Sequence, residues 1–150
     1  MTEWNSRRDR ATATVRTAVA TSGVSWGELA ERLDRPLLWT IAALLGSHAL
    51  PAELAVTAGD LLDLDDETVA ALQEQPYRLH GDELKHDPTI YRFYELLAVY
   101  GPALKEAIHE EFGDGIMSAI NCRVQMDRRE DPDGDRVRIV IDGKFLKYQW

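Results

Sequence analysis

The chain has 150 residues, of which 45% are hydrophobic and 29% charged, a balance typical of a globular protein and not of a disordered one. This length suits one ordinary domain or two small ones. The net charge is -9 and the pI about 4.9, so phosphate backbones and anionic membrane surfaces repel the protein as a whole. Nucleic acid and membrane are therefore disfavoured partners, and a small anionic substrate would need a local cationic group to capture it.

The cysteine content and the N-terminal residues indicate the compartment. Cys122 is the single cysteine, so no intrachain disulfide can form, which suits a reducing environment. No apolar signal core follows the N-terminus, and no apolar run approaches membrane-spanning length. We therefore expect a cytoplasmic protein.

The first half of the chain reads as a series of short helices. Residues 7–22 are rich in Ala and Thr and predict a first helix. The spacing of Ser25 and Glu28 predicts a capping box at the start of a second helix. Pro36 is typical of the start of a third helix, which Gly46 is expected to end.

Two further helical patterns follow. Pro51 opens a helix that we expect to stop near Gly59, and the acidic run 65–67 suits the start of the next, where the helix dipole favours negative charge. Residues 1–75 are therefore predicted to form an all-α bundle of four or five helices. Residues 76–86 show no clear period and are interpreted as a linker.

Residues 87–150 predict a separate domain that contains both helix and strand. Residues 87–88 are an Asp-Pro pair typical of an N-cap and the first helical position, and the helix is expected to break and restart at residues 101–102. Apolar and polar side chains then alternate through residues 119–142, on both sides of a turn at residues 131–135. This pattern predicts a β-hairpin.

The predicted hairpin lacks a partner. Two strands alone are marginally stable in water, and no third strand is evident in the sequence. We therefore predict an α+β fold, in which a helix-turn-helix-like bundle precedes a small domain of helix and two-stranded hairpin. The hairpin is expected to pair with another subunit, so that a second copy of this chain is the expected protein partner.

The first half resembles a helix-turn-helix unit, which raises DNA binding as an alternative function. Base recognition requires Arg, Lys, Asn or Gln on the reading helix, and residues 37–45 contain none of these. Residues 23–75 hold two Arg and no Lys against ten Asp and Glu. A DNA-binding regulator is therefore disfavoured against a bundle that packs or assembles.

Several other motifs lack the context that would give them a function. Residues 113–118 imitate a dinucleotide fingerprint, but they follow a helix and lack the third glycine. Asp131, Asp133 and Asp135 imitate a calcium loop whose glycine falls at the fourth position instead of the sixth. Cys122 lies on the apolar face of its strand and is expected to be a small core residue. The four histidines show no metal-ligand spacing, so no metal site is predicted: His48, His80, His86 and His109.

Arg92 and Glu95 form the most informative pair of charges. They are three residues apart on a predicted helix, so they share a face. Spacing alone favours a surface ion pair. However, Tyr91, Phe93 and Tyr94 surround them in sequence, so we expect partial burial, and a buried charge usually has a specific role.

Three strings of the second half carry a more specific signal. They read Asp-Pro-Thr-Ile-Tyr-Arg-Phe-Tyr-Glu-Leu-Leu at residues 87–97, Val-Tyr-Gly at residues 99–101 and Phe-Gly-Asp-Gly-Ile-Met-Ser-Ala-Ile-Asn at residues 112–121. Together they closely resemble the cyanase family. The resemblance continues weakly at residues 131–132 and 142–144 and reaches back to residues 42–46 and 49–52, in the right order, and so covers most of the chain.

The resemblance implies a set of catalytic residues, which fall on Arg92, Glu95 and Ser118. In the family the Arg and the Glu lie on one helix and the Ser precedes the first strand. The sequence departs from the family elsewhere: Cys122 stands where an aromatic residue is expected, and residues 147–150 lack the usual prolines.

The resemblance also implies the reaction. Bicarbonate attacks the carbon of cyanate, the adduct decarboxylates to carbon dioxide and carbamate, and carbamate then gives ammonia and carbon dioxide. Bicarbonate is the co-substrate, so no cofactor is expected. The family is a decamer built from dimers, with its sites at subunit contacts. A non-catalytic assembly protein of the same fold stays an alternative, although the intact Arg, Glu and Ser argue against it.

The demands of this chemistry suggest a role for each residue. Arg92 can hold carboxylate-like anions with its planar donors. An ionised Glu95 would repel those anions, so we expect it to orient Arg92 or to hold a water. Ser118 can donate its hydroxyl, assisted by backbone N–H groups of residues 115–119. A serine nucleophile is not indicated, because no His or Lys stands at an activating spacing.

Overall fold

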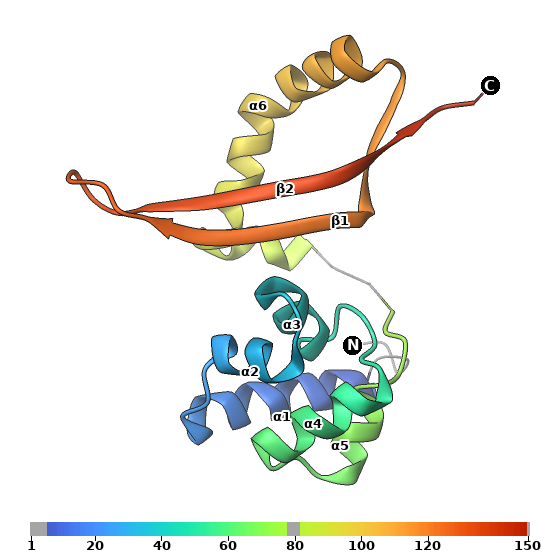
Figure 1. The fold of residues 1–150 in the computed structure, drawn as a ribbon, viewed down its shortest axis with the longest axis vertical. Helices are drawn as coiled ribbons and strands as arrows, with labels where there is room; N and C mark the ends of the chain where they lie inside the picture. Colours follow the sequence, from blue (N-terminus) through green and yellow to red (C-terminus); the bar gives the residue numbers. More distant parts are fainter. Residues whose placement is uncertain (1–5, 78–81, 150) are drawn as a thin grey trace. The chain divides into compact units, whose positions relative to one another are not determined.

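A computed structural model describes residues 6–77 and 82–149 (Figure 1). These residues fall into two compact units, one comprising residues 6–77 with 124–139 and the other residues 82–123 with 140–149. Part of the predicted linker and His80 lie outside the described residues. The observed α+β composition, helices followed by a two-stranded hairpin, confirms the predicted fold class.

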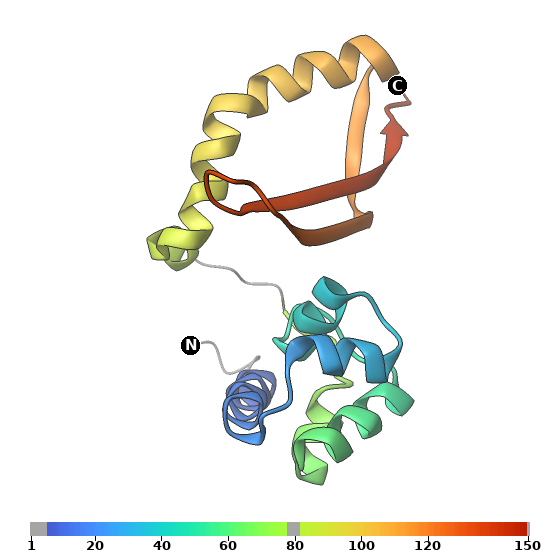
Figure 2. The same cartoon turned by 60° about the vertical axis from the view of Figure 1, so that its left-hand side comes forward.

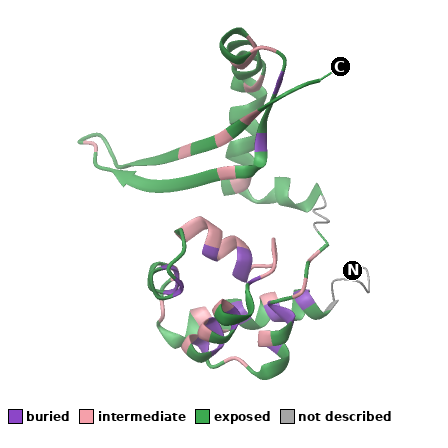
Figure 3. Ribbon diagram, turned by 45° about the vertical axis from the view of Figure 1, so that its right-hand side comes forward, coloured by how far each residue is buried: buried purple, intermediate pink, exposed green. Residues whose placement is uncertain are grey.

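Five α-helices precede residue 78: α1 (Ser6–Ser22), α2 (Trp26–Leu33), α3 (Leu37–Leu44), α4 (Ala52–Leu62) and α5 (Asp66–Ala71). They pack around one apolar core, in which every helix has a buried residue. The fully or nearly buried members of that core are Val15, Leu29, Leu33, Ala43, Leu44, Leu50, Ala55, Ala58, Leu62 and Leu72. Figure 3 shows the buried residues gathered in these helices.

The predicted capping box at the start of α2 is confirmed. Ser25 Oγ accepts a hydrogen bond from the backbone N–H of Glu28 at 3.1 Å, and Glu28 Oε2 accepts one from the backbone N–H of Ser25 at 2.8 Å. The backbone and side-chain hydrogen bonds from Ser25 lower the pKa of the Glu28 carboxyl. Two N–H groups without partners in the helix are thereby satisfied.

Gly46 and Gly59 are required in this bundle for different reasons. Gly46 follows the end of α3 with φ of +94°, as expected of a glycine that ends a helix. The predicted stop near Gly59 is wrong, because α4 continues to Leu62. A Cβ at Gly59 would lie 2.5 Å from Cγ2 of Val69 in α5, so the close packing of two helices requires this glycine.

A buried arginine joins α1 to the end of α3. Arg8 is 3% exposed, and its Nη2 donates to the carbonyl oxygens of Ala43 at 2.5 Å and His48 at 3.3 Å. Burial lowers the pKa of Arg8, while the Glu74 carboxylate acts in the opposite direction. Among the described residues, its Nε and Nη1 have no hydrogen-bond partner. A cation therefore satisfies carbonyl groups at a helix C-terminus, where the helix dipole favours it.

The part of the chain after residue 81 is built on one long helix and a hairpin, of which residues 124–139 belong to the first unit. Its elements are the 3₁₀ helix η2 (Asp82–His86), α6 (Pro88–Phe112), β1 (Gly115–Arg129) and β2 (Arg136–Lys147), and the two strands pair with each other. The predicted N-cap of α6 is confirmed, since Asp87 Oδ1 accepts from the N–H groups of Thr89 at 2.8 Å and Ile90 at 2.9 Å.

The expected break at residues 101–102 is wrong, because α6 runs without interruption from Pro88 to Phe112 and includes Pro102. Figures 1 and 2 show instead that the helix bends along its length. A proline inside a helix removes one hydrogen bond and crowds the preceding turn, which produces a kink without ending the helix.

The hairpin is longer than predicted, and its apolar face is uncovered within the single chain. Ile120 is 88% exposed and Val137 is 73% exposed. Figure 3 shows that most of both strands and of α6 is exposed. Cys122 is half-buried, so the prediction of a core position is wrong. The described residues contain no third strand that could pack against this face.

We predict that replacing Arg8 with Ala loosens the bundle, because the carbonyl groups of Ala43 and His48 lose a charged donor. The free energy of opening of the α1 and α3 amides should fall by about 2–3 kcal/mol. Native-state hydrogen exchange on the intact protein measures this. Arg16→Ala, an exposed position on the same helix, is the matched control and should change it by less than about 0.5 kcal/mol. Equal protection in both variants would contradict the assigned role of Arg8.

Candidate active site

Arg92 and Glu95 form an ion pair on α6. Arg92 Nη1 donates to Glu95 Oε2 at 2.7 Å, which shows that one carboxylate oxygen fixes one end of the guanidinium. The two side chains are 67% and 50% exposed. The predicted partial burial is therefore not found in the single chain. The flanking aromatic residues are exposed as well, since no described segment covers this face of α6.

Ser118 lies in the first part of β1 and is only 7% exposed. Its Oγ accepts hydrogen bonds from the backbone N–H groups of Ile120 at 3.1 Å and Asn121 at 2.9 Å. A hydroxyl has two acceptor lone pairs and one hydrogen to donate. Because two amides occupy the lone pairs, the chemistry left to Ser118 is donation of its O–H.

In the described parts of the single chain, the side chains of Arg92, Glu95 and Ser118 do not form one connected site. Arg92 contacts Glu95, and Ser118 contacts its own strand, but no hydrogen bond or ion pair between described residues links Ser118 to the ion pair. All three residues belong to the second unit. One chain therefore presents two separate parts of the predicted set: a paired guanidinium and an oriented hydroxyl.

A surface hollow of about 480 Å³ lies between α6 and the start of β1. One of its lining residues, Met117, precedes Ser118 in the sequence. Most of its lining is apolar, and it includes Lys105, His109 and Met117. It includes none of Arg92, Glu95 and Ser118. This apolar lining suits contact with another protein surface better than it suits binding of small anions.

His109 makes two contacts in this hollow that were not predicted from the sequence. Lys105 Nζ lies 3.4 Å from His109 Nδ1, and His109 Nε2 lies 3.3 Å from the carbonyl oxygen of Gly115. A carbonyl oxygen can only accept, so Nε2 is the donor in the contact with Gly115. The pair thereby ties the last turn of α6 to the start of β1. The i,i+4 spacing of Lys105 and His109 is the signal that could have suggested their contact.

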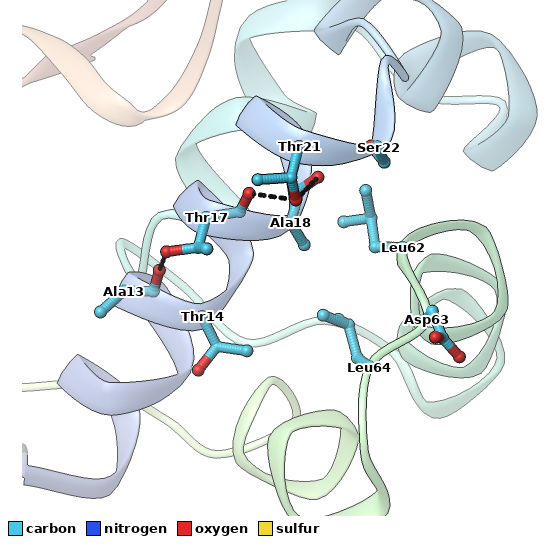
Figure 4. A pocket seen from close by; sticks show the side chains of 9 residues that line it. All are labelled: Ala13, Thr14, Thr17, Ala18, Thr21, Ser22, Leu62, Asp63 and Leu64. Carbon is cyan, nitrogen blue, oxygen red and sulfur yellow. Dashed lines mark hydrogen bonds between the residues drawn. The ribbon is translucent and has the colours of Figure 1, made fainter.

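A second hollow, of about 610 Å³, lies in the first unit between α1 and residues 62–64 (Figure 4). Thr14, Thr17 and Thr21 line its α1 side, and each hydroxyl donates to a carbonyl one turn earlier in the helix. Asp63 is the one charged residue in its lining. Without a cation, this hollow does not suit an anionic substrate.

Two other classes of site are absent from the described parts of the chain. No group of three or more His, Cys, Asp and Glu side chains is arranged to hold a metal ion there. None of the helices in residues 6–77 and 82–149 is both long and apolar enough to cross a bilayer.

Comparison with known proteins covers nearly the whole chain. Residues 8–76 match the family described as "Cyanate hydratase, N-terminal", and residues 82–150 match the "Cyanate lyase C-terminal domain". A protein of Mycolicibacterium vanbaalenii named cyanate hydratase is 55% identical over 144 residues, covering 95% of this chain and 94% of that protein. A cyanate hydratase of Thiobacillus denitrificans is 49% identical over 143 residues, covering 95% and 97% of the two chains.

A solved structure agrees with the sequence relatives. The crystal structure of cyanase from T. urticae superimposes with a TM-score of 0.82 at 38% identity, covering 91% of this chain and 96% of that chain. Fold and sequence therefore indicate the same relationship across both units. The chain belongs to the cyanate lyase family, also named cyanate hydratase.

Proposed function

We propose that this protein is a lyase that decomposes cyanate in a bicarbonate-dependent reaction. One observation carries the proposal: Arg92, Glu95 and Ser118 are all present in a chain that matches a cyanate hydratase at 55% identity over 95% of its length. The DNA-binding alternative has no such support. Its reading helix would be α3 (Leu37–Leu44), which carries no basic or amide side chain.

The reaction places two monoanions in one site. An oxygen of bicarbonate forms a bond to the cyanate carbon, and the resulting dianionic adduct loses carbon dioxide. The nitrogen takes up one proton, so cyanate, bicarbonate and a proton give carbamate and carbon dioxide. Carbamate with a second proton then gives ammonia and carbon dioxide. The protein must therefore bring like charges together and stabilise the dianion, which is a task of positioning and electrostatics.

Arg92 is the proposed anion clamp. Its guanidinium is planar and presents several donors, which can hold a carboxylate-like group in two parallel hydrogen bonds. Glu95 takes one edge of that guanidinium through Nη1 at 2.7 Å. In this proposal the ionised Glu95 orients Arg92 and does not contact the anions, which it would repel. The protein as a whole carries a charge of -9, so this local cation is the group that attracts the substrates.

Ser118 is the proposed second donor. Its Oγ accepts from the amides of Ile120 and Asn121, so the hydroxyl hydrogen is left to donate to a third group. Such a donor can bind an oxygen of the adduct without reorganising during the reaction. Ser118 is not proposed as a nucleophile, because its described contacts include no base that could accept its proton. A contribution from the backbone N–H groups of residues 115–119 stays a prediction.

We also propose that the active protein is an oligomer whose sites are shared between subunits, a decamer built from dimers as the family resemblance implies. The exposed apolar face of the hairpin supports this, since Ile120 and Val137 are largely uncovered in the single chain. The separation of Ser118 from the Arg92–Glu95 pair supports it too. A second copy packed on the hairpin could bring Arg92 of one chain to Ser118 of another.

The remaining parts of the proposal concern cofactors and location. Bicarbonate supplies the nucleophile, so the chemistry requires neither a metal nor an organic cofactor. A cytoplasmic location is consistent with an unpaired Cys122, which a reducing compartment would keep as a thiol.

The first prediction concerns the reaction itself. Purified protein should release ammonia from cyanate when bicarbonate is present, and the rate should fall to background when bicarbonate and dissolved carbon dioxide are removed. Ammonia release measured in a closed, gas-purged cell checks this. Absence of ammonia with both anions present would refute the proposed function.

The second prediction concerns the planar fork of Arg92. Arg92→Lys keeps the charge but loses the bidentate geometry, so kcat/KM should fall by about 10²-fold or more while the protein stays folded. Arg7→Lys is the matched control, because Arg7 is another exposed arginine paired with a carboxylate, that of Glu74. Turnover near that of the wild type in Arg92→Lys would reduce Arg92 to a surface ion-pair partner.

The third prediction concerns shared sites. Arg92→Ala and Ser118→Ala proteins should each retain only a small, measurable residual activity, yet mixing equal amounts of them under subunit exchange should restore activity well above that residue. If each site takes Arg92 from one chain and Ser118 from another across a two-fold contact, about one quarter of the sites become complete at full exchange.

Differently tagged subunits, recovered together after mixing, show that exchange has taken place. Each single variant carried through the same exchange procedure alone provides the control. Recovery of no activity after demonstrated exchange would contradict sharing between subunits.

A further inference from the structure

A close approach between β1 and β2 occurs at Ser118, and a glycine permits it. A Cβ at Gly143 would overlap Cγ of Met117, and it would lie 2.7 Å from the carbonyl oxygen of Ser118 and 3.0 Å from Sδ of Met117. Real Cβ atoms almost never lie this close to a non-bonded atom, so a side chain at position 143 would force its neighbours to move. Gly143 does not need an unusual backbone conformation, since no positive φ occurs there. The requirement for glycine at position 143 is therefore one of space.

The two neighbours of that space differ in what they can do. The Met117 side chain is flexible and can move aside. The Ser118 carbonyl belongs to the backbone, so any side chain at position 143 must push the strand itself. That movement would act on the residue whose hydroxyl is held by the amides of Ile120 and Asn121.

A second glycine repeats the arrangement from the opposite strand. A Cβ at Gly115 would lie 2.6 Å from Cζ of Phe145 and 3.0 Å from the carbonyl carbon of Leu146. The carbonyl oxygen of Gly115 also accepts from His109, which fixes this end of β1 to α6. Two strands with a glycine each thus approach closely at Ser118 and again at Gly115, three residues before it.

We infer that Gly143 is a positioning residue for the Ser118 hydroxyl. It lets β2 press against the Ser118 backbone, and this contact keeps Oγ within reach of both amides, so that the O–H has one direction in which to donate. The inference rests on the proposed function, in which Ser118 donates to the anionic adduct. A displacement of about 1 Å at such a donor can reduce turnover by about 10²-fold.

The test uses full-length oligomeric protein and two substitutions in a double-mutant cycle. Gly143→Ala should lower kcat by about 10²-fold with no change in oligomer size. In a Ser118→Ala background, the same substitution should lower kcat no further, because the group that it displaces is already gone. Gly27→Ala is the control, since its nearest neighbour would be Ser25 Oγ at an ordinary 3.8 Å, and its kcat should equal that of the wild type.

Two outcomes of the cycle would overturn the inference. One is a kcat near that of the wild type in Gly143→Ala. The other is a loss in the Ser118→Ala background as large as in the wild type, which would mean that Gly143 acts on the fold and not through Ser118.

A second variant covers the case in which Gly143→Ala fails to fold. Met117→Ala combined with Gly143→Ala removes the side-chain overlap and leaves only the contact with the Ser118 carbonyl. We expect this protein to assemble and still show the loss in kcat. Recovery of wild-type turnover would assign the effect to Met117, and failure of both variants to fold would assign Gly143 a purely structural role. Either result overturns the inference.

Crystal structures of the wild type and of Gly143→Ala provide a readout that does not depend on activity. The Ser118 Oγ should lose at least one of its hydrogen bonds to Ile120 and Asn121 in the variant, and an unchanged Ser118 would overturn the inference. A wild type without cyanate activity would instead refute the proposed function. The two failures are therefore distinguishable.

Discussion

The uncovered apolar face of a two-stranded hairpin is the constraint on which the rest of the account depends. Two paired strands bury too little surface to be stable alone in water. Ile120 and Val137 remain exposed although their side chains are apolar. In the proposed assembly another chain completes this sheet. The same strand carries Ser118, so the segment that requires a partner is also the segment that supplies one of the proposed catalytic groups.

The division of the proposed site into two parts has a physical logic. Arg92 and Glu95 lie on the exposed face of α6, where the guanidinium is oriented but open to water. A cation in water attracts anions weakly, and the same cation in a covered site attracts them much more strongly. Covering α6 with a second copy would exclude water and bring in a hydroxyl whose oxygen already accepts from two amides. Assembly and activation of Arg92 would then be one event.

Local features of this chain were predicted from sequence, and features set by tertiary packing were not. The capping box at Ser25 and the N-cap at Asp87 depend on residues within one turn, and both are confirmed. The prediction of a helix end at Gly59 was wrong because glycine is required there by the packing of Val69, ten residues away on another helix. Pro102 was misread as a break, although neighbouring turns carry α6 through it. The identity of the proposed site residues came from family resemblance. Their contacts, above all the two amides at Ser118 and the space at Gly143, are properties of three-dimensional structure that no spacing reveals.

The central claim is that one chain holds an incomplete site and that a second copy completes it. Specific activity followed by dilution, with molecular mass measured by light scattering on the same samples, tests this most directly. Because association follows mass action, dilution below the dissociation constant must release subunits. We expect specific activity to fall in proportion to the loss of oligomer and to return on reconcentration. A constant specific activity in samples that are mostly monomer would contradict it.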